Sequence, residues 1–328
     1  MKRNKTIDLL RFILSILIVP IHADLFMDVS TPLYRCFSVG LVRVGVPFFF
    51  IVSGFFLKRR VESGKSAREN MLRHAKLWVV FLLLDLAITG WFYYPNFENT
   101  GAFIHKALFT GLSDAYWFMP ILIITQCILI PVFRRGKTYI AVLIGLVLYL
   151  FAMTHDSYSF LFEGTLLYRL SELHTKAFIF PQGGIVESVF LISLGGLFYE
   201  KREWLTTALL NKRRFLEGGI VLFCAALMAE AYITQSHGAY DGNCYLSLLV
   251  LPALLFLWAY IADPVTFDTG KLGEISLYIY LVHPIIVSIM RMIGAGSVIR
   301  TTAAIMLSLL IGCGIVAWKD RRKAGKIL

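Results

Sequence analysis

Apolar segments about as long as a membrane-spanning helix recur along this whole chain, and short polar segments separate them. An α-helix needs ~20 apolar residues to cross a bilayer, and several segments approach that length. The segments do not alternate between apolar and polar residues as barrel strands do, so helices are the structure that satisfies their backbone in lipid. The pattern therefore predicts about ten membrane-spanning helices, at residues 7–27, 38–57, 77–94, 116–133, 138–153, 183–200, 215–234, 243–261, 272–291 and 298–318.

The composition excludes a soluble globular protein. Hydrophobic residues make up 58% of the 328 residues and charged residues 16%, whereas soluble domains are roughly 45–50% apolar and ~25% charged. The first residues have the order of a secretory signal, but Asp8 and Arg11 interrupt the apolar run and no small-x-small cleavage site follows His22. We therefore expect a retained first helix, and we interpret residues 1–328 as one all-α domain, a polytopic membrane helix bundle.

The basic residues predict an orientation. Of the 32 Lys and Arg residues, 24 fall in the segments on the same side of the membrane as the N-terminus and four fall on the other side. Cytoplasmic loops carry this excess, so the N- and C-termini are predicted to be cytoplasmic and the protein to be a multi-pass protein of the plasma membrane. The net charge of +11 then needs no nucleic-acid partner. The five cysteines have no metal-ligand spacing, so no metal site is predicted.

No loop exceeds about 30 residues, and no dinucleotide or phosphate-loop fingerprint occurs, so any chemistry must take place within the helix bundle. Arg11 and His22 are eleven positions apart, which is three helical turns plus 20° and ~16 Å of rise. One face of the first helix therefore carries a cation toward the cytoplasm and an imidazole toward the outside. Alone, each residue is explained equally well as an interfacial side chain; together on one face they indicate a lined cavity.

Further polar residues lie within the other apolar segments. Arg43 is in the outer third of the segment 38–57. Because Pro47 has no backbone N–H, the carbonyl of Arg43 lacks its helical hydrogen bond, which favours a bend there. Ser276, Tyr280 and His283 share one stripe of the segment 272–291, and a hydrogen-bonded packing seam between helices explains that stripe equally well.

Three carboxylates are also predicted to be buried, each able to balance an arginine or orient an imidazole: Asp85, Glu187 and Glu230. The sequence leaves their partners open. Asp24 is two positions after His22 and thus on the other side of the helix, so an interfacial position is the simpler interpretation.

Four motifs, in order, resemble those of the membrane-bound acyltransferase-3 family. The segment IDLLRFILSILIVPIHA carries the Arg-x10-His signature at Arg11 and His22. The segments RVGVPFFFIVSGFFL, YWFMP and LGEISLYIYLVHP are similar to the family's second-helix, fourth-helix and late-helix patterns. The resemblance extends over essentially the whole chain.

This resemblance implies transfer of an acyl group, commonly acetyl, from cytoplasmic acyl-CoA to a hydroxyl of a cell-envelope glycan or similar acceptor. Arg11, with Arg59 and Arg60, would bind the CoA phosphates, and Ser53 of the second motif is placed with the donor site. His22 would act as general base or as an acyl-carrying relay. Arg43 would stabilise the oxyanion or hold the acceptor. Acyl-CoA would be a donor substrate, with no metal required.

A second resemblance gives an alternative. The segments YWFMP and AYDGNCYLSLLVLPALLFL are also similar to the membrane domain of VanT-type serine racemases from vancomycin-resistance clusters, where this module is linked to serine supply. In those proteins a soluble racemase domain that uses pyridoxal phosphate follows the module. Residues 1–328 hold no such domain, so we expect no racemase activity from them. The alternative function is an L-serine pathway that serves a linked racemase domain or partner, and a noncatalytic role in an envelope assembly is a third possibility.

Overall fold

The computed structural model describes residues 3–96, 98–109, 112, 115–177 and 184–324, and these residues form helices and turns without a strand. Each of the ten predicted segments overlaps one long helix. The long helices are α1 (Lys5–His22), α3 (Gly45–Glu62), α4 (Arg68–Tyr93), α6 (Phe118–Arg134), α7 (Thr138–Met153), α10 (Gly184–Glu200), α12 (Arg213–Ser236), α13 (Ser247–Ala262), α14 (Leu272–Met292) and α15 (Ser297–Ala324). The all-α prediction is therefore confirmed for the described residues.

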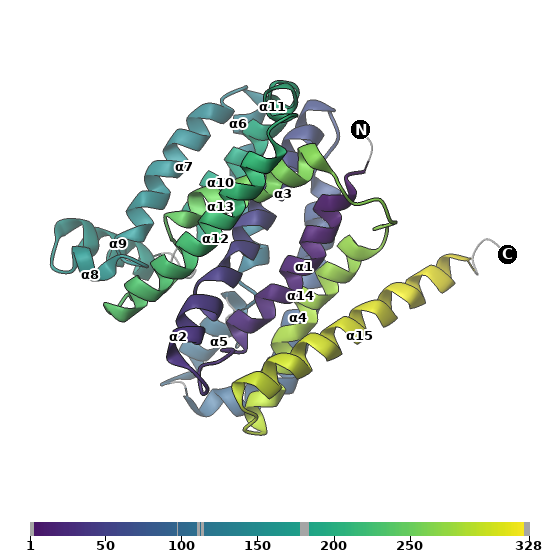
Figure 1. Ribbon diagram of the computed structural model, residues 1–328. Helices are drawn as coiled ribbons and strands as arrows, with labels where there is room; N and C mark the ends of the chain where they lie inside the picture. The colour runs from purple at the N-terminus through teal and green to yellow at the C-terminus, as the bar shows by residue number, and fades with distance from the viewer. Residues whose placement is uncertain (1–2, 97, 110–111, 113–114, 178–183, 325–328) are drawn as a thin grey trace.

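Shorter elements connect the long helices. They are α2 (Thr31–Leu33), the π-helical turn Tyr34–Ser38, the 3-10 turns Leu41–Val44 and Tyr94–Asn96, α5 (Thr100–Phe109), α8 (Ser159–Phe162), α9 (Leu166–Ala177) and α11 (Arg202–Leu209). The N-terminus and α11 lie at one end of the bundle, and α2 and α5 lie at the opposite end (Figure 1). We call the first the basic end because α3 finishes there with Lys58, Arg59 and Arg60.

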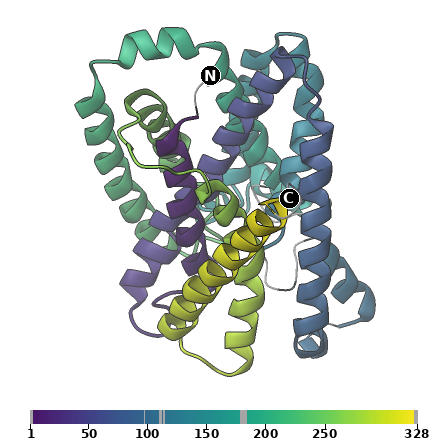
Figure 2. The same ribbon diagram turned by 90° about the vertical axis from the view of Figure 1, so that its right-hand side faces the viewer.

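Several helices can cross a membrane. Five helical stretches of the described chain are long and apolar enough: Thr31–Glu62, Arg68–Asn96, Arg213–Ser236, Leu272–Met292 and Ser297–Arg322. Helices α6, α7 and α13 are apolar but shorter. Exposed residues in the middle of α15, such as Leu310 and Ile311, are apolar, and this helix lies on the outside of the bundle (yellow in Figure 2). The chain is thus built as a multi-pass membrane protein; ten spans and cytoplasmic termini stay predictions.

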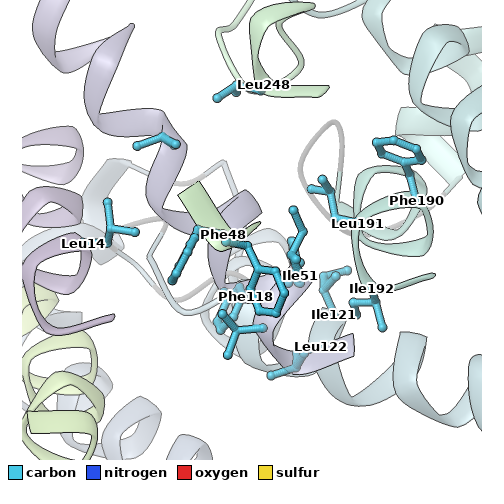
Figure 3. Close-up of a cluster of buried hydrophobic side chains, with 14 of the residues drawn as sticks. Leu14, Phe48, Ile51, Phe118, Ile121, Leu122, Phe190, Leu191, Ile192 and Leu248 are labelled. Carbon is cyan, nitrogen blue, oxygen red and sulfur yellow. The ribbon is translucent and has the colours of Figure 1, made fainter. Parts of the chain in front are cut away.

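The centre of the bundle is the crossing of α3 and α10. A Cβ atom at Gly54 would lie 1.9 Å from the carbonyl oxygen of Ile192, and one at Gly195 would lie 2.0 Å from that of Ile51. Only glycine allows two backbones to approach this closely. Around the crossing, Ile51, Ile192 and Ile121 of α6 belong to one buried apolar cluster (Figure 3).

Two predicted segments differ from the structure at the end opposite the basic end. The second helix begins at Gly45 and not at residue 38, because π and 3-10 turns precede it. Pro47 lies in the first turn of α3, where its missing N–H has no helical partner in any case. The first helix ends at His22 and not at residue 27, because Asp24 and Phe26 adopt left-handed backbone with φ of 51° and 70°. Non-glycine residues rarely adopt that conformation, and it cannot continue a helix.

Candidate functional site

One cavity of about 820 Å³ extends through the described part of the bundle. Arg11 and His22, both from α1, line it together, as the eleven-residue spacing predicts. At the basic end its lining includes Arg59, Arg60 and Arg73. The cavity thus has a cationic mouth and also reaches His22, which lies ~16 Å farther along α1 than Arg11, since a helix rises ~1.5 Å per residue.

Arg11 stands beside an acidic neighbour at the cationic mouth. Its Nη1 atom is 3.8 Å from the Asp8 carboxylate, which also accepts a hydrogen bond from Arg3. Gly273 of α14 leaves room for the guanidinium, since a Cβ there would lie 3.2 Å from Arg11 Nη1. Ser53 lines the same cavity. The guanidinium of Arg11 is a third exposed, so it is accessible to an anionic group in the cavity.

His22 stands beside a second imidazole. The ring centroids of His22 and His283 are 5.4 Å apart. His283 is fully buried in α14, and its Nδ1 lies 3.0 Å from the Ile279 carbonyl oxygen. A carbonyl only accepts, so Nδ1 carries the proton of neutral His283. Its Nε2 has no hydrogen-bond partner among the residues that the structure describes.

The backbone of His22 is held by two arginines. Arg291 Nη2 donates to the His22 carbonyl at 2.7 Å, and Arg300 Nε donates to the Ala23 carbonyl at 2.9 Å. The Asp24 carboxylate accepts from Arg291 at 2.8 Å and lies 3.4 Å from Arg300. Cations are favourable at a helix C-terminus, where carbonyl groups lack helical partners. We call Asp24, Arg291 and Arg300 the clamp, because their bonds hold the end of α1 against α14 and α15. The Asp24 carboxylate thus pairs with the two arginines and not with the His22 imidazole.

Arg43 lines the cavity from the 3-10 turn before α3. It donates a hydrogen bond to the Asn243 side chain, and its Nη2 is 3.6 Å from the Asp241 carboxylate. Asn243 in turn donates to Asp241 at 2.7 Å. Arg43 Nε has no partner among the described residues. One edge of the guanidinium is thus fixed and another keeps a free donor.

Behind this network lies a buried carboxyl group, Asp156, in the turn after α7. It accepts hydrogen bonds from the Asn243 backbone at 3.0 Å and from Ser157 at 2.9 Å. Burial, with the nearby Asp241 carboxylate, raises the pKa of Asp156 to about 7. Sequence reasoning missed Asp156 and the Asp241–Asn243 pair, although the polar run from Tyr240 to Asn243 marks that pair.

Glu187 is the one predicted carboxylate that lines the cavity. It lies in the first turn of α10 and is only 2% exposed, and its side chain forms no hydrogen bond or ion pair with other described residues. Tyr280 and Ser276 also line the cavity and at the same time tie helices together: Tyr280 donates to the Ala115 carbonyl and Ser276 to the Arg11 carbonyl, both at 3.1 Å. The predicted packing seam and the cavity wall are therefore the same surface.

The hydrogen-bond partners of Asp85 and Glu230 are neither arginines nor imidazoles. Asp85 is fully buried in α4, where it accepts from Thr89 at 3.2 Å and from the Leu112 backbone at 3.4 Å. Glu230 accepts from Tyr158 and from the backbone at the start of α13, with 2.6 Å to Leu246 N. Unsatisfied N–H groups at a helix start attract a carboxylate, so Glu230 serves as a structural cap.

Comparison with known proteins gives one family. The family model described as "Acyltransferase domain", acyltransferase-3, matches residues 4–318. A curated "Amino-acid racemase" of Enterococcus faecalis is 22% identical over 326 residues, which cover 96% of this chain and 45% of that protein. A "Serine/alanine racemase" of Enterococcus gallinarum is 26% identical over 303 residues, which cover 86% of this chain and 40% of that protein.

The chain spans less than half the length of these relatives. No solved structure matches it. The family match extends over nearly the whole chain and includes every residue that lines the deep part of the cavity, from Arg11 to Tyr280. This multi-pass membrane protein therefore belongs to the acyltransferase-3 family.

Proposed function

We propose that this protein transfers an acyl group, commonly acetyl, from cytoplasmic acyl-CoA to a hydroxyl of an extracytoplasmic acceptor such as a cell-envelope glycan. The observation that carries the proposal is that one and the same cavity is lined by the arginines of the cationic mouth and by His22. A donor with phosphates at one end and a thioester at the other needs such a path. The basic end faces the cytoplasm in this proposal, as the distribution of Lys and Arg predicts.

The phosphates of acyl-CoA would bind to the arginines at the cationic mouth of the cavity. Arg11, Arg59 and Arg60 line the basic end of the cavity, and guanidinium groups match phosphate oxygens in geometry and charge. The pantetheine arm would then extend past Ser53 toward His22. The cavity lining is partly aromatic, with Phe49, Phe118 and Tyr280, and these rings would exclude water from the thioester.

Chemistry takes place at His22. A neutral imidazole removes the proton from the acceptor hydroxyl, whose oxygen attacks the thioester carbonyl carbon. The tetrahedral intermediate collapses with cleavage of the C–S bond, and the imidazolium returns its proton to the leaving thiolate, so an ester and free CoA thiol result. The guanidinium of Arg43, which lines the same cavity, would stabilise the intermediate's oxyanion. A relay through an acyl-histidine would use the same His22 side chain.

Arg11→Ala tests the donor site. Loss of a guanidinium that contacts phosphate is expected to weaken acetyl-CoA binding by about tenfold, since a charge-assisted hydrogen bond contributes ~1.5 kcal/mol or more. Isothermal titration of the purified protein measures the affinity. Arg35→Ala is the matched control, because Arg35 is a half-buried arginine that donates a hydrogen bond to Ser236 and does not line the cavity. Equal affinity of wild type and Arg11→Ala would remove Arg11 from the donor site.

A second function is favoured by Glu187 and by the racemase names of the relatives. An unpaired carboxylate and an arginine with a free donor line one cavity, and they are suited to the ammonium and carboxylate groups of an amino acid. The cavity would then be a pathway for L-serine that serves a racemase domain or partner. Uptake of labelled serine into proteoliposomes without an acyl donor would establish this function, and its absence together with acyl transfer would establish the first.

A further inference from the structure

We infer a binding site for the phosphodiester headgroup of an anionic membrane lipid at the basic end of the bundle. It lies beside the cavity that Arg11 and His22 line, which we call the deep cavity. The site is a second cavity of about 570 Å³, between the last residues of α3, α10 and α13 and the first turns of α11. Its polar lining includes Arg59, Tyr199, Arg202, Glu203 and Tyr260.

Two guanidinium groups face this second cavity. Arg202 is held in place: its Nη1 donates to the Tyr199 carbonyl at 2.8 Å, and its guanidinium carbon lies 4.4 Å from the centre of the Tyr199 ring. Its ion pair with Glu203 is weak, at 3.4 Å with an 89% exposed carboxylate. The side chain of Arg59 forms no ion pair or hydrogen bond with any other described residue, and Arg59 is half-buried. The cavity therefore contains one positioned cation and one cation without a partner.

The formal charge of the residues that line the second cavity indicates which class of anion fits it. Two arginines and one glutamate give the cavity a formal charge of +1, which matches a phosphodiester with a single negative charge better than a phosphate dianion. The phenol groups of Tyr199 and Tyr260 add donors for phosphate oxygens. Basic pockets between membrane helices bind lipid headgroups through this chemistry.

The surroundings of the cavity place it at a bilayer surface. Helix α11 lies across the end of the bundle (Figure 1). Its Trp204 is 66% exposed, and Leu210 just beyond its end is 60% exposed, while Leu205 packs inward. Exposed Trp and Leu beside basic residues are typical of a helix that lies in the membrane interface. The acyl chains of a bound lipid can therefore remain in the bilayer while its phosphate enters the cavity.

Arg59 lines the deep cavity as well as this one. A lipid phosphate at Arg59 would stand at the rim of the cationic mouth. The lipid site itself does not depend on the proposed acyl transfer, because its test measures lipid binding alone.

The test is native mass spectrometry of the purified full chain with phosphatidylglycerol or phosphatidylcholine at equal concentration. Wild type is expected to retain phosphatidylglycerol about fivefold more strongly, since a basic residue near the bilayer surface contributes ~1 kcal/mol to attraction of anionic lipid. Arg202→Gln is expected to lose this preference. Arg213→Gln is the matched control, because Arg213 is an exposed arginine nearby that pairs with Glu217 at 2.7 Å, and it should keep the preference.

Three results would overturn the inference. They are equal retention of the two lipids by wild type, equal loss in Arg202→Gln and Arg213→Gln, and displacement of phosphatidylglycerol by inorganic phosphate, which would indicate a site for a free anion. If Arg202→Gln is not monodisperse, Arg59→Gln removes the other guanidinium from the opposite wall, and it is expected to give the same loss.

Discussion

At the scale of single residues, His22 is positioned by contacts to its backbone. Its carbonyl is the acceptor for Arg291, and its ring centroid lies 5.4 Å from that of His283. A candidate base with few side-chain bonds keeps its nitrogens free for a substrate proton. Its placement then depends on the clamp that Asp24, Arg291 and Arg300 form at the end of α1.

Arg291→Ala should therefore slow acyl transfer without changing the affinity for acetyl-CoA. The substitution frees the His22 carbonyl and removes the shorter of the two ion pairs of Asp24. We expect a fall in kcat of about tenfold or more, because small displacements of a base are costly. Acetyl-CoA affinity should stay unchanged, and Arg291→Lys should recover part of the rate. Stopped transfer assays with titration of acetyl-CoA separate kcat from KM. A change confined to KM, or none at all, would contradict the clamp.

Asp156 predicts a pH dependence of stability. The ordinary pKa of an aspartate is ~3.9, and burial raises that of Asp156 to about 7. Between these values the folded protein binds a proton that the unfolded chain has lost, so stability falls as pH rises through this window. Thermal unfolding in detergent should show a higher midpoint at pH ~5 than at pH ~7.5. Asp156→Asn should reduce that slope, and an identical slope in wild type and variant would contradict the assignment.

At the scale of elements, hydrophobic length located the helices, but it did not locate two of their ends. Helix α1 stops at His22 because Asp24 takes left-handed backbone and is held by arginines more than 260 positions away in the chain. The turns from Tyr34 to Val44 replace the start of the expected second helix. The end of α1 and the start of α3 both depend on tertiary contacts, and these cannot be predicted from the spacing of apolar residues.

The crossing of α3 and α10 gives a prediction at this scale. A Cβ at Gly195 would lie 2.0 Å from the Ile51 carbonyl oxygen, so Gly195→Ala must separate the two helices. We expect a loss of stability of about 1–3 kcal/mol or more, as for overpacked cores. Gly314→Ala is the control, because a Cβ there meets no atom within 4 Å, and helical alanine is favoured over glycine. Thermal unfolding of both variants measures the difference; equal midpoints would contradict the packing.

At the scale of the whole molecule, the sequence predicted that two polar side chains line the same cavity only when both belong to one helix. The spacing of Arg11 and His22 fixed their common face, and both line the deep cavity. The carboxylates were harder to place, because the face that each helix turns inward is set by packing: Glu187 faces the cavity, whereas Asp85 and Glu230 bond elsewhere. The Asp241–Asn243 support of Arg43 comes from a connecting segment without periodicity.

The central claim is that the deep cavity leads a donor from the basic end, in the cytoplasm, to His22. The most direct measurement is transfer of labelled acetyl from acetyl-CoA to envelope material in inside-out membrane vesicles, with wild type and His22→Ala side by side. We predict transfer by wild type, a loss of about 100-fold or more in His22→Ala, unchanged acetyl-CoA binding in both, and no transfer in sealed right-side-out vesicles. Wild-type rates in His22→Ala, or transfer when acetyl-CoA reaches only the outer face, would contradict the account.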